Sequence, residues 1–313
     1  MNETSGRAPR KDSCRRARSV PDLSLTALAA QLFTGLVLGG ILVLLATGLS
    51  LIFGLMGVVN FAHGSLYMLG AYFGFFLWGF TRSYWAALLI APLMVGLFGV
   101  LVERSMIRRL YGRGPDDPLL LTFGLSLALV ETAKLVWGKI GLTLDPPAQL
   151  AGAINLGFMK FPAFRLFVIA VTALVLVGLW LFLEKTNVGL IVRAGTRDPL
   201  MVRALGIDLG RIWLLVFGVG TAMAGLAGIL AGPLRGVYAE MGVEIIIECF
   251  VVVVVGGMGS LPGAVVAGLL IGEVVSLTSY FAPKLAEIIV FVVMALVLLL
   301  RPSGLFGEPG LAE

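Results

Sequence analysis

The stretch GLMGVVNFAHGSLYMLGAY, residues 54–72, interrupts one of the most apolar regions of this chain with polar side chains and glycines. It contains Asn60 and His63, and His63 is the only histidine in the sequence. Polar side chains are costly inside a bilayer and usually face the interior of a helical bundle, a cavity or a partner. The stretch therefore predicts a broken or re-entrant segment within a membrane-embedded bundle.

The composition around this stretch is that of an integral membrane protein. The 313 residues are 59% hydrophobic and 13% charged, whereas a soluble domain is about a quarter charged. Several apolar runs reach the roughly 20 residues that a helix needs to cross about 30 Å of hydrocarbon. We expect an all-α, polytopic transmembrane helical bundle of about 8–10 membrane segments, here 28–53, 58–80, 84–103, 118–138, 163–183, 212–232, 244–257, 261–281 and 285–300.

The domain organisation that follows is simple, because no soluble domain fits between the predicted segments. Residues 1–25 predict a disordered basic tail, and residues 26–308 predict a single transmembrane domain with a polar loop at 184–211. Two similar runs, GLMG at 54–57 and GGMG at 256–259, each precede two apolar segments. Glycine-interrupted segments at corresponding positions are typical of transporters with two structural halves, and chance similarity is the alternative.

The basic residues are clustered next to the predicted spans. Of the 23 Lys and Arg residues, six fall in 1–22, four in 104–114 and five in 185–211. This is the pattern of cytoplasmic loops in membrane proteins, so the net charge of +5 does not indicate nucleic-acid binding. A cytoplasmic tail and a cytoplasmic 104–114 segment require an even number of crossings between them, but three runs intervene. Either one run holds a re-entrant or additional crossing, or the basic tail lies outside.

The sequence carries no recognisable catalytic or metal-binding pattern. It lacks the G-x-x-x-x-G-K-[ST] motif of ATP-binding loops and the H-E-x-x-H motif of zinc enzymes. Cys14 and Cys249 are too few and too far apart in the sequence for a metal site or a disulfide framework. We therefore expect no enzymatic activity, no bound metal and no cofactor in this chain.

The loop EKTNVGLIVRAGTRDPLMVRALGIDLGRI, residues 184–212, predicts a short helix with a cap at each end. Asp198 is a favourable N-cap, Pro199 suits the first helical position, and Gly206 can adopt the left-handed conformation that ends a helix. A helix of about two turns is not stable alone in water. We expect it to pack against a partner protein at the cytoplasmic surface or against anionic headgroups. The face that it would present consists of Met201, Val202 and Leu205.

Polar residues inside the predicted spans are the remaining candidates for a functional site. Asn60 and His63 are three residues apart and share a helix face. They either line a solute path at the break or hydrogen-bond the backbone groups that the break sets free, and we favour the second role. Glu248 and Glu273 lie deep in apolar runs, so each is a candidate for a carboxylate that faces the path.

Four stretches of the chain carry a resemblance to a known family. They are GLSLIFGLMGVVNFAHGSLYMLGAY (48–72), VRAGTRDPLMVRALGIDLGRI (192–212), VVVVVGGMGSLPGAVVAGLLIGEV (251–274) and RPSGLFG (301–307). In this order they resemble the signature, the coupling loop, the Gly-rich motif and the C-terminal end of branched-chain amino acid ABC-importer permeases of the LivH type. The resemblance covers about 30–308, which is all of the chain except the basic tail and the last few residues.

The resemblance implies a permease subunit of a bacterial plasma membrane that works by alternating access. It implies as partners a second permease subunit, two cytoplasmic ATPase subunits that bind the ATP, and a periplasmic binding protein that delivers a small amino acid. The implied ATPase-docking positions are Arg193, Ala194, Gly195, Asp198, Leu205 and Gly206. The implied positions of the translocation path or helix break are Asn60, Phe61, His63, Gly64, Gly256, Gly257 and Gly259.

The sequence departs from the family pattern in two places and leaves alternatives open. Pro199 is unusual, and Glu244 and Glu248 stand where the family often has a basic residue. The alternative function is an ion- or proton-coupled secondary transporter, which His63, Glu248 and Glu273 would serve. Within the importer interpretation, a small amide such as urea is the alternative to an amino acid as substrate.

Overall fold

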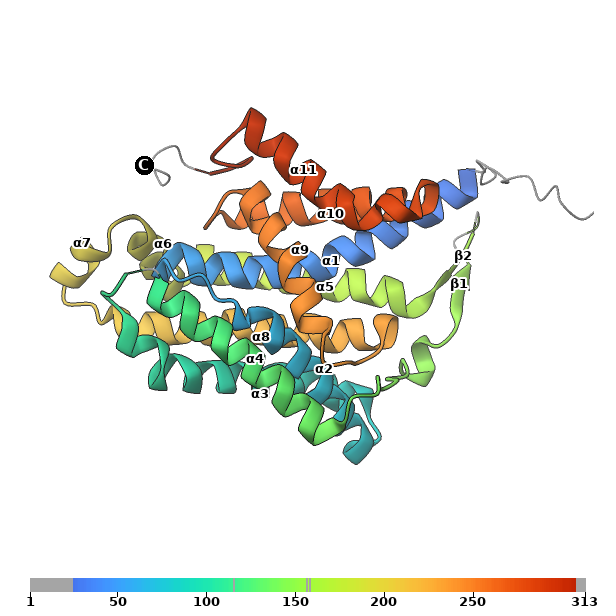
Figure 1. The fold of residues 1–313 in the computed structure, drawn as a ribbon, viewed down its shortest axis with the longest axis horizontal. Coiled ribbons are helices and arrows are strands. Elements are labelled where there is room, and N and C mark those ends of the chain that lie inside the picture. The colour runs from blue at the N-terminus through green and yellow to red at the C-terminus, as the bar shows by residue number, and fades with distance from the viewer. Residues whose placement is uncertain (1–24, 115, 156, 158, 308–313) are drawn as a thin grey trace, which may run out of the picture.

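The computed structural model describes residues 25–114, 116–155, 157 and 159–307, which form a bundle of mostly aligned helices (Figure 1). This confirms the all-α class. Of the predicted tail, 1–25, residues 1–24 lie outside the described residues, and Leu25 is the first residue of α1. The elements are α1 Leu25–Met56, α2 Ala62–Thr81, α3 Tyr84–Ser105, η1 Ile107–Leu110, α4 Asp116–Trp137, η2 Ala148–Leu150, β1 Ala153–Asn155, β2 Lys160–Pro162, α5 Ala163–Lys185, α6 Asn187–Arg197, α7 Pro199–Ala204, α8 Leu209–Arg235, α9 Met241–Gly256, α10 Leu261–Phe281, η3 Pro283–Leu285 and α11 Ala286–Leu300.

Seven helical segments in the described part of the chain are long and apolar enough to span a bilayer. They are 25–56, 84–110, 116–137, 163–185, 209–235, 261–281 and 283–300. The other two predicted segments correspond to α2 and α9. Helix α9 has 16 residues, about 24 Å at 1.5 Å per residue, and is shorter than a hydrocarbon core of about 30 Å. Each predicted segment thus corresponds to a helix, and the polytopic bundle is confirmed.

Helix α1 lies at the centre of the bundle, and its residues from Gly39 to Ile52 are all buried. It contacts α5, α8, α9 and α10. Near its start, the ring of Phe33 lies 5.4 Å from that of Phe161 in β2. Near its end, Leu55 Cδ1 would lie 3.1 Å from a Cβ at Gly195 in α6. Helix α1 therefore extends through the bundle from the β1–β2 hairpin to α6.

The two ends of the bundle carry different elements, the β1–β2 hairpin at one end and α6 and α7 at the other (Figure 1). The basic segment 104–114 belongs to the α7 end, since the ring of Tyr111 lies 4.6 Å from that of Trp213 near the start of α8. Before this segment, α1 runs from the hairpin end to the α7 end, α2 returns from inside the bundle toward the hairpin end, and α3 runs back to the α7 end. The start of α1 therefore lies at the end opposite α7, so the described part of the chain enters from the side opposite the basic loops.

Glycines let the central helices approach one another closely. Helix α8 crosses α2 so tightly that a Cβ at Gly228 would collide with the carbonyl oxygen of Tyr67. Helix α10 crosses α1 in the same way, and a Cβ at Gly268 would lie 2.6 Å from Val43 Cγ2. Small residues at such crossings allow the backbone-to-backbone packing that stabilises helices in a membrane.

Candidate functional site

The first break in the bundle separates α1 from α2 and leaves residues 57–61 outside regular helix. It begins at Gly57, whose φ of 64° favours glycine. The chain then turns back into the bundle, since His63 Nε2 lies 3.1 Å from the carbonyl oxygen of Leu45. Leu45 precedes the last residue of α1 by eleven residues, which is roughly 16 Å of helix. Helix α2 thus begins inside the bundle, and the predicted broken segment is confirmed.

The backbone of this break is satisfied by Thr122 of α4. The Phe61 N–H donates to Thr122 Oγ1 at 3.1 Å, and the hydroxyl donates to the Val59 carbonyl at 3.3 Å and to that of Leu119 at 3.1 Å. Backbone groups released inside a bilayer need such protein partners because hydrocarbon offers none. Sequence reasoning missed Thr122, whose only signal is a hydroxyl within an apolar helix, 61 residues after Phe61.

Asn60 and His63 do not have the role that we favoured from the sequence. Both are fully buried. His63 Nε2–H donates to Leu45 of α1, while His63 Nδ1 and both polar atoms of the Asn60 amide have no hydrogen-bond partner among the residues that the structure describes. The expectation that Asn60 bonds the freed backbone groups was wrong, because Thr122 occupies those groups.

Phe61 and Gly64 place the break at a junction of three helices. The Phe61 ring packs 4.8 Å from the ring of Phe250 in α9 and 6.2 Å from that of Phe123 in α4. A Cβ at Gly64 would collide with the Gly242 carbonyl oxygen at the start of α9. The two residues therefore fix how α2 passes between α4 and α9, which is a structural role next to any role in transport.

The second break separates α9 from α10 and begins at Gly257, whose φ is 99°. The C-terminal stretch folds back onto this break. The Leu305 N–H donates to the Val255 carbonyl at 2.8 Å, and the Phe306 N–H donates to the Gly256 carbonyl at 3.0 Å. These bonds satisfy the last carbonyl groups of α9, which have no partner within the helix.

The two breaks lie side by side in the bundle. A Cβ at Gly54 would lie only 3.1 Å from Gly259 Cα, and Gly259 has a φ of 81°. The GLMG and GGMG runs are therefore neighbours in space as well as similar in sequence. The relation between the two halves of the chain stays a prediction.

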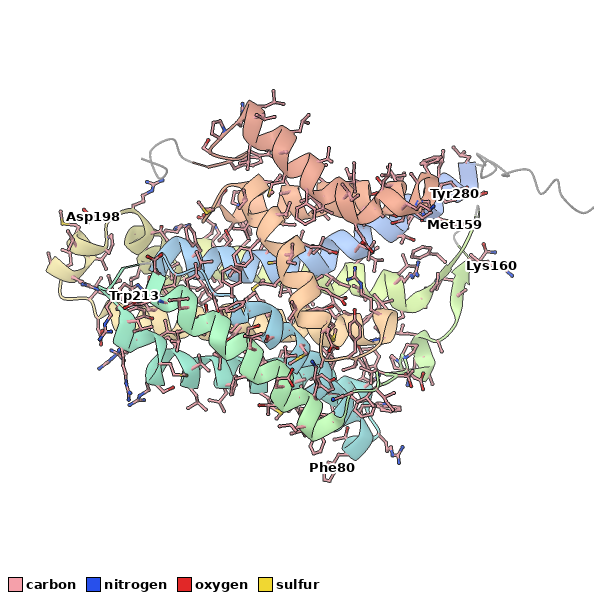
Figure 2. The ribbon with its side chains drawn as sticks, in the orientation of Figure 1. Phe80, Met159, Lys160, Asp198, Trp213 and Tyr280 are labelled. Atoms are coloured by element: carbon pink, nitrogen blue, oxygen red, sulfur yellow. The ribbon has the colours of Figure 1, made fainter. Side chains whose placement is uncertain are left out.

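The α7 tip, residues 198–206, projects from the end of the bundle, where Figure 2 labels Asp198. Its predicted caps are confirmed: Asp198 Oδ1 accepts the Met201 N–H at 2.9 Å, and Gly206 has a φ of 80°. The predicted face was wrong in one member, because Val202 is buried while Met201 and Leu205 are exposed together with Leu200. Helix α7 contacts both α6 and α8, and packing at this junction buries Val202.

The implied docking residues divide into two groups. Arg193 of α6 forms an ion pair with Glu184 of α5, and Gly195 is buried, with Leu55 and Leu209 closest to the position of a Cβ. Ala194 is exposed on the same helix. The three members at the α7 tip, Asp198, Leu205 and Gly206, are all exposed.

The two candidate carboxylates lie on different helices. Glu273 of α10 faces α1, where a Cβ at Gly35 would collide with its carboxyl group, and its Oε2 is buried without a hydrogen-bond partner in the described part of the chain. Glu248 of α9 follows Glu244 by one turn, and Glu244 accepts a hydrogen bond from the Tyr238 hydroxyl at 2.5 Å. Their surroundings are separate, and their exposure to a path stays a prediction.

Charged residues at the hairpin end of the bundle form a small network. Lys134, in the last turn of α4, places Nζ 3.0 Å from Glu131 Oε1 and 3.0 Å from Glu240 Oε1. The hydrogen bond from Lys134 lowers the pKa of the Glu240 carboxyl. Exposed pairs of this kind contribute little to stability. Within the described ranges, no group of three His, Cys, Asp or Glu residues is placed to hold a metal ion.

Comparisons with known proteins agree with one another. The family model described as "Branched-chain amino acid transport system / permease component" matches residues 31–298. The chain is 32% identical over 293 residues to the high-affinity branched-chain amino acid transport system permease protein BraD of Pseudomonas aeruginosa, covering 89% of this chain and 95% of that protein. It is 30% identical to LivH of Escherichia coli K12, with the same coverage, and 28% identical to LivM of that organism, over 85% of this chain and 67% of LivM. No solved structure matches the chain.

Proposed function

Because this chain belongs to the family of branched-chain amino acid transport system permease components, we propose that it forms part of the membrane path of an importer for branched-chain or related small amino acids. Relatives named LivH and LivM are both permease proteins of such systems. A second, related permease subunit is therefore the partner that we propose within the membrane. The membrane itself is the plasma membrane of a bacterium.

The observation that carries the proposal is the exposed apolar surface of the α7 tip. Leu200, Met201 and Leu205 are 76%, 58% and 70% exposed at the end of the bundle. A helix of six residues is too short to be stable by itself, and its apolar side chains need a cover. The flanking arginines suit either anionic headgroups or a protein. Membership in the family favours a protein, and we propose one of two cytoplasmic ATPase subunits that bind the ATP.

A displacement of the α7 tip would be transmitted to the rest of the bundle through two contacts. Val202 is buried, and the Arg203 guanidinium lies 5.2 Å from the ring of Trp213 in α8. Helix α6, which joins α7 at Asp198, packs against α5 and α1. Closure of the ATPase subunits would therefore move α6 and α8 with α7, and this motion would switch the path between its two open sides. A periplasmic binding protein would deliver the solute to the hairpin end.

The rival function, an ion- or proton-coupled transporter, has weaker support. Proton transfer needs a chain of ionisable partners. The hydrogen bonds of the described residues connect the His63 ring only to the backbone of Leu45. Glu273 faces glycine on α1, not a basic side chain. The family relation and these contacts both favour ATP-driven transport.

Uptake by the complex of both permeases and the ATPases, reconstituted with the periplasmic binding protein, tests the proposal. Leucine uptake should require ATP and survive an uncoupler. Leu205→Asp should lower it about tenfold or more and weaken co-purification of the ATPases, because an unpaired carboxylate in an apolar groove is costly. Ile154→Asp, an equally drastic change at an exposed apolar residue of the β1–β2 hairpin, is the matched control for co-purification of the ATPases, which it should leave unchanged. Uptake that collapses with the proton gradient, or wild-type uptake by Leu205→Asp, would refute the proposal.

A further inference from the structure

A cavity of about 1080 Å³ opens between α1, α5, α6 and α10 in the half of the bundle nearest α7. Ligand sites in proteins commonly span about 300–1,000 Å³, so the cavity can hold a small solute together with water. Its apolar lining comes from residues of four elements. They include Leu51, Leu176, Leu179, Leu183, Leu190 and Val265.

A hydroxyl without a hydrogen-bond partner in the described protein lies next to the cavity. Ser50 of α1 is fully buried, lines the cavity, and its Oγ has no hydrogen-bond partner among the described residues. Thr47, one turn earlier, differs because its hydroxyl donates to the Val43 carbonyl at 2.6 Å. A buried polar group without a partner is costly. Ser50 borders the cavity but exposes no surface to it, so a solute gains this hydroxyl as a partner only when the walls of the cavity move apart.

Charged residues of both signs line the cavity on its α6 side. Glu184 of α5 and Arg193 of α6 form an ion pair, and Arg197 of α6 also lines the cavity. The two guanidinium groups can attract a carboxylate, and the glutamate can attract an ammonium group. An aliphatic wall next to charges of both signs matches an amino acid with a branched aliphatic side chain.

We propose that this cavity is a binding site for the transported amino acid, with its aliphatic side chain among the leucines and its charged groups toward Glu184, Arg193 and Arg197. The inference rests on the proposed function and adds the site to it. One wall of the cavity is α6, the helix joined directly to the α7 tip. The ion pair from Arg193 to Glu184 connects this wall to α5. Displacement of α7 would move the wall and change the space that the solute occupies.

A cavity-filling variant tests the site in the reconstituted complex. Leu190 is 59% exposed and lines the cavity, so Leu190→Trp should fill space at little cost in folding. Leucine uptake should fall at least fivefold, and the ratio of leucine to alanine uptake should fall with it, because the larger solute loses more room. Leu181→Trp is the control, since Leu181 is 43% exposed on α5 and does not line the cavity.

Ser50→Ala gives an independent measurement. Because Ser50 Oγ is buried without a partner in the described protein, its removal should leave thermal stability equal to that of the wild type or raise it slightly. The KM for leucine should rise about two- to tenfold, the effect of one lost hydrogen bond, while the maximal rate should stay within twofold of the wild type.

Several outcomes would refute the proposal that the cavity binds the transported amino acid. An unchanged leucine-to-alanine ratio in Leu190→Trp would do so, whether the two uptake rates stay the same or fall equally. So would an unchanged KM in Ser50→Ala. Native mass spectrometry that shows a phospholipid lost from Leu190→Trp, with the uptake ratio unchanged, would assign the cavity to lipid instead. Absence of ATP-driven uptake by the wild type would refute the proposed function, and is distinguishable from each of these results.

Discussion

Replacing Thr122 by valine keeps the shape of the side chain and removes the hydroxyl that hydrogen-bonds the backbone of the break between α1 and α2. In the structure this hydroxyl accepts the Phe61 N–H at 3.1 Å and donates to the Val59 carbonyl at 3.3 Å. Both backbone groups lie where lipid and the neighbouring helices exclude water. The variant should therefore destabilise the break between α1 and α2 without changing its packing.

The expected loss in the free energy of unfolding depends on which backbone groups lose a hydrogen-bond partner. The Phe61 N–H loses its acceptor entirely, whereas the Val59 carbonyl loses a long bond that the hydroxyl shares with Leu119. An unsatisfied buried group costs about 1–3 kcal/mol, and hydrogen bonds within membrane proteins average about 0.6 kcal/mol in double-mutant cycles. We expect the free energy of unfolding to fall by about 1–2 kcal/mol, most of it from Phe61.

Equilibrium unfolding in mixed micelles with increasing dodecyl sulfate measures this change. Thr132→Val is the matched control, because Thr132 lies on the same helix, is exposed, and its hydroxyl donates to the Ala128 carbonyl within that helix at 2.7 Å. Its effect should stay within about 0.5 kcal/mol. Hydrogen exchange at the Phe61 amide should also become faster in Thr122→Val. Equal losses of stability in the two variants, or unchanged exchange at Phe61, would refute the reasoning.

Three further predictions concern glycines and the exposed ion pair. Gly64→Ala should abolish recovery of monodisperse protein in detergent, because its Cβ would collide with a backbone carbonyl of α9, whereas Gly124→Ala, with open space around it, should give the wild-type yield. Gly206→Ala should weaken coupling of uptake to ATP hydrolysis, since alanine at a φ of 80° costs about 1–2 kcal/mol; unaltered coupling would contradict this. Lys134 lowers the pKa of Glu240, so this pair stabilises the protein above the unfolded-state pKa and loses its effect as pH falls through the lowered value. The small difference in the free energy of unfolding between the wild type and Glu240→Gln should therefore shrink in acid. A difference that grew in acid would contradict this prediction.

Features with a local signal could be predicted from the sequence. The membrane segments follow from runs of apolar residues, because hydrocarbon selects for each span separately. The caps of α7 follow from Asp198 and Gly206, since each acts within about one turn of its own position. The break between α1 and α2 follows from glycines and polar residues within an apolar run. In all of these, the physical cause lies within a few residues of the feature.

Assignments that depended on partners elsewhere in the chain were less successful. Asn60 was expected to bond the opened backbone, but Thr122 bonds it from α4. Val202 was placed on the exposed face of α7, but packing buries it. The ion pair from Arg193 to Glu184 beside a cavity was not expected from the sequence, and the docking role of Arg193 stays a prediction. The two corrections and the ion pair each arise from a neighbour that sequence spacing does not reveal.

The sequence by itself determined that this chain is a helical membrane protein of the branched-chain amino acid permease family, where its segments lie, and where two of them are interrupted. The tertiary structure decided what completes those interruptions: Thr122 at the first, and Leu305 and Phe306 at the second. It also formed the cavity between α1, α5, α6 and α10. The reason is that a backbone group inside a bilayer must find its partner in the protein. Which group becomes that partner depends on how the helices cross, not on their order along the chain.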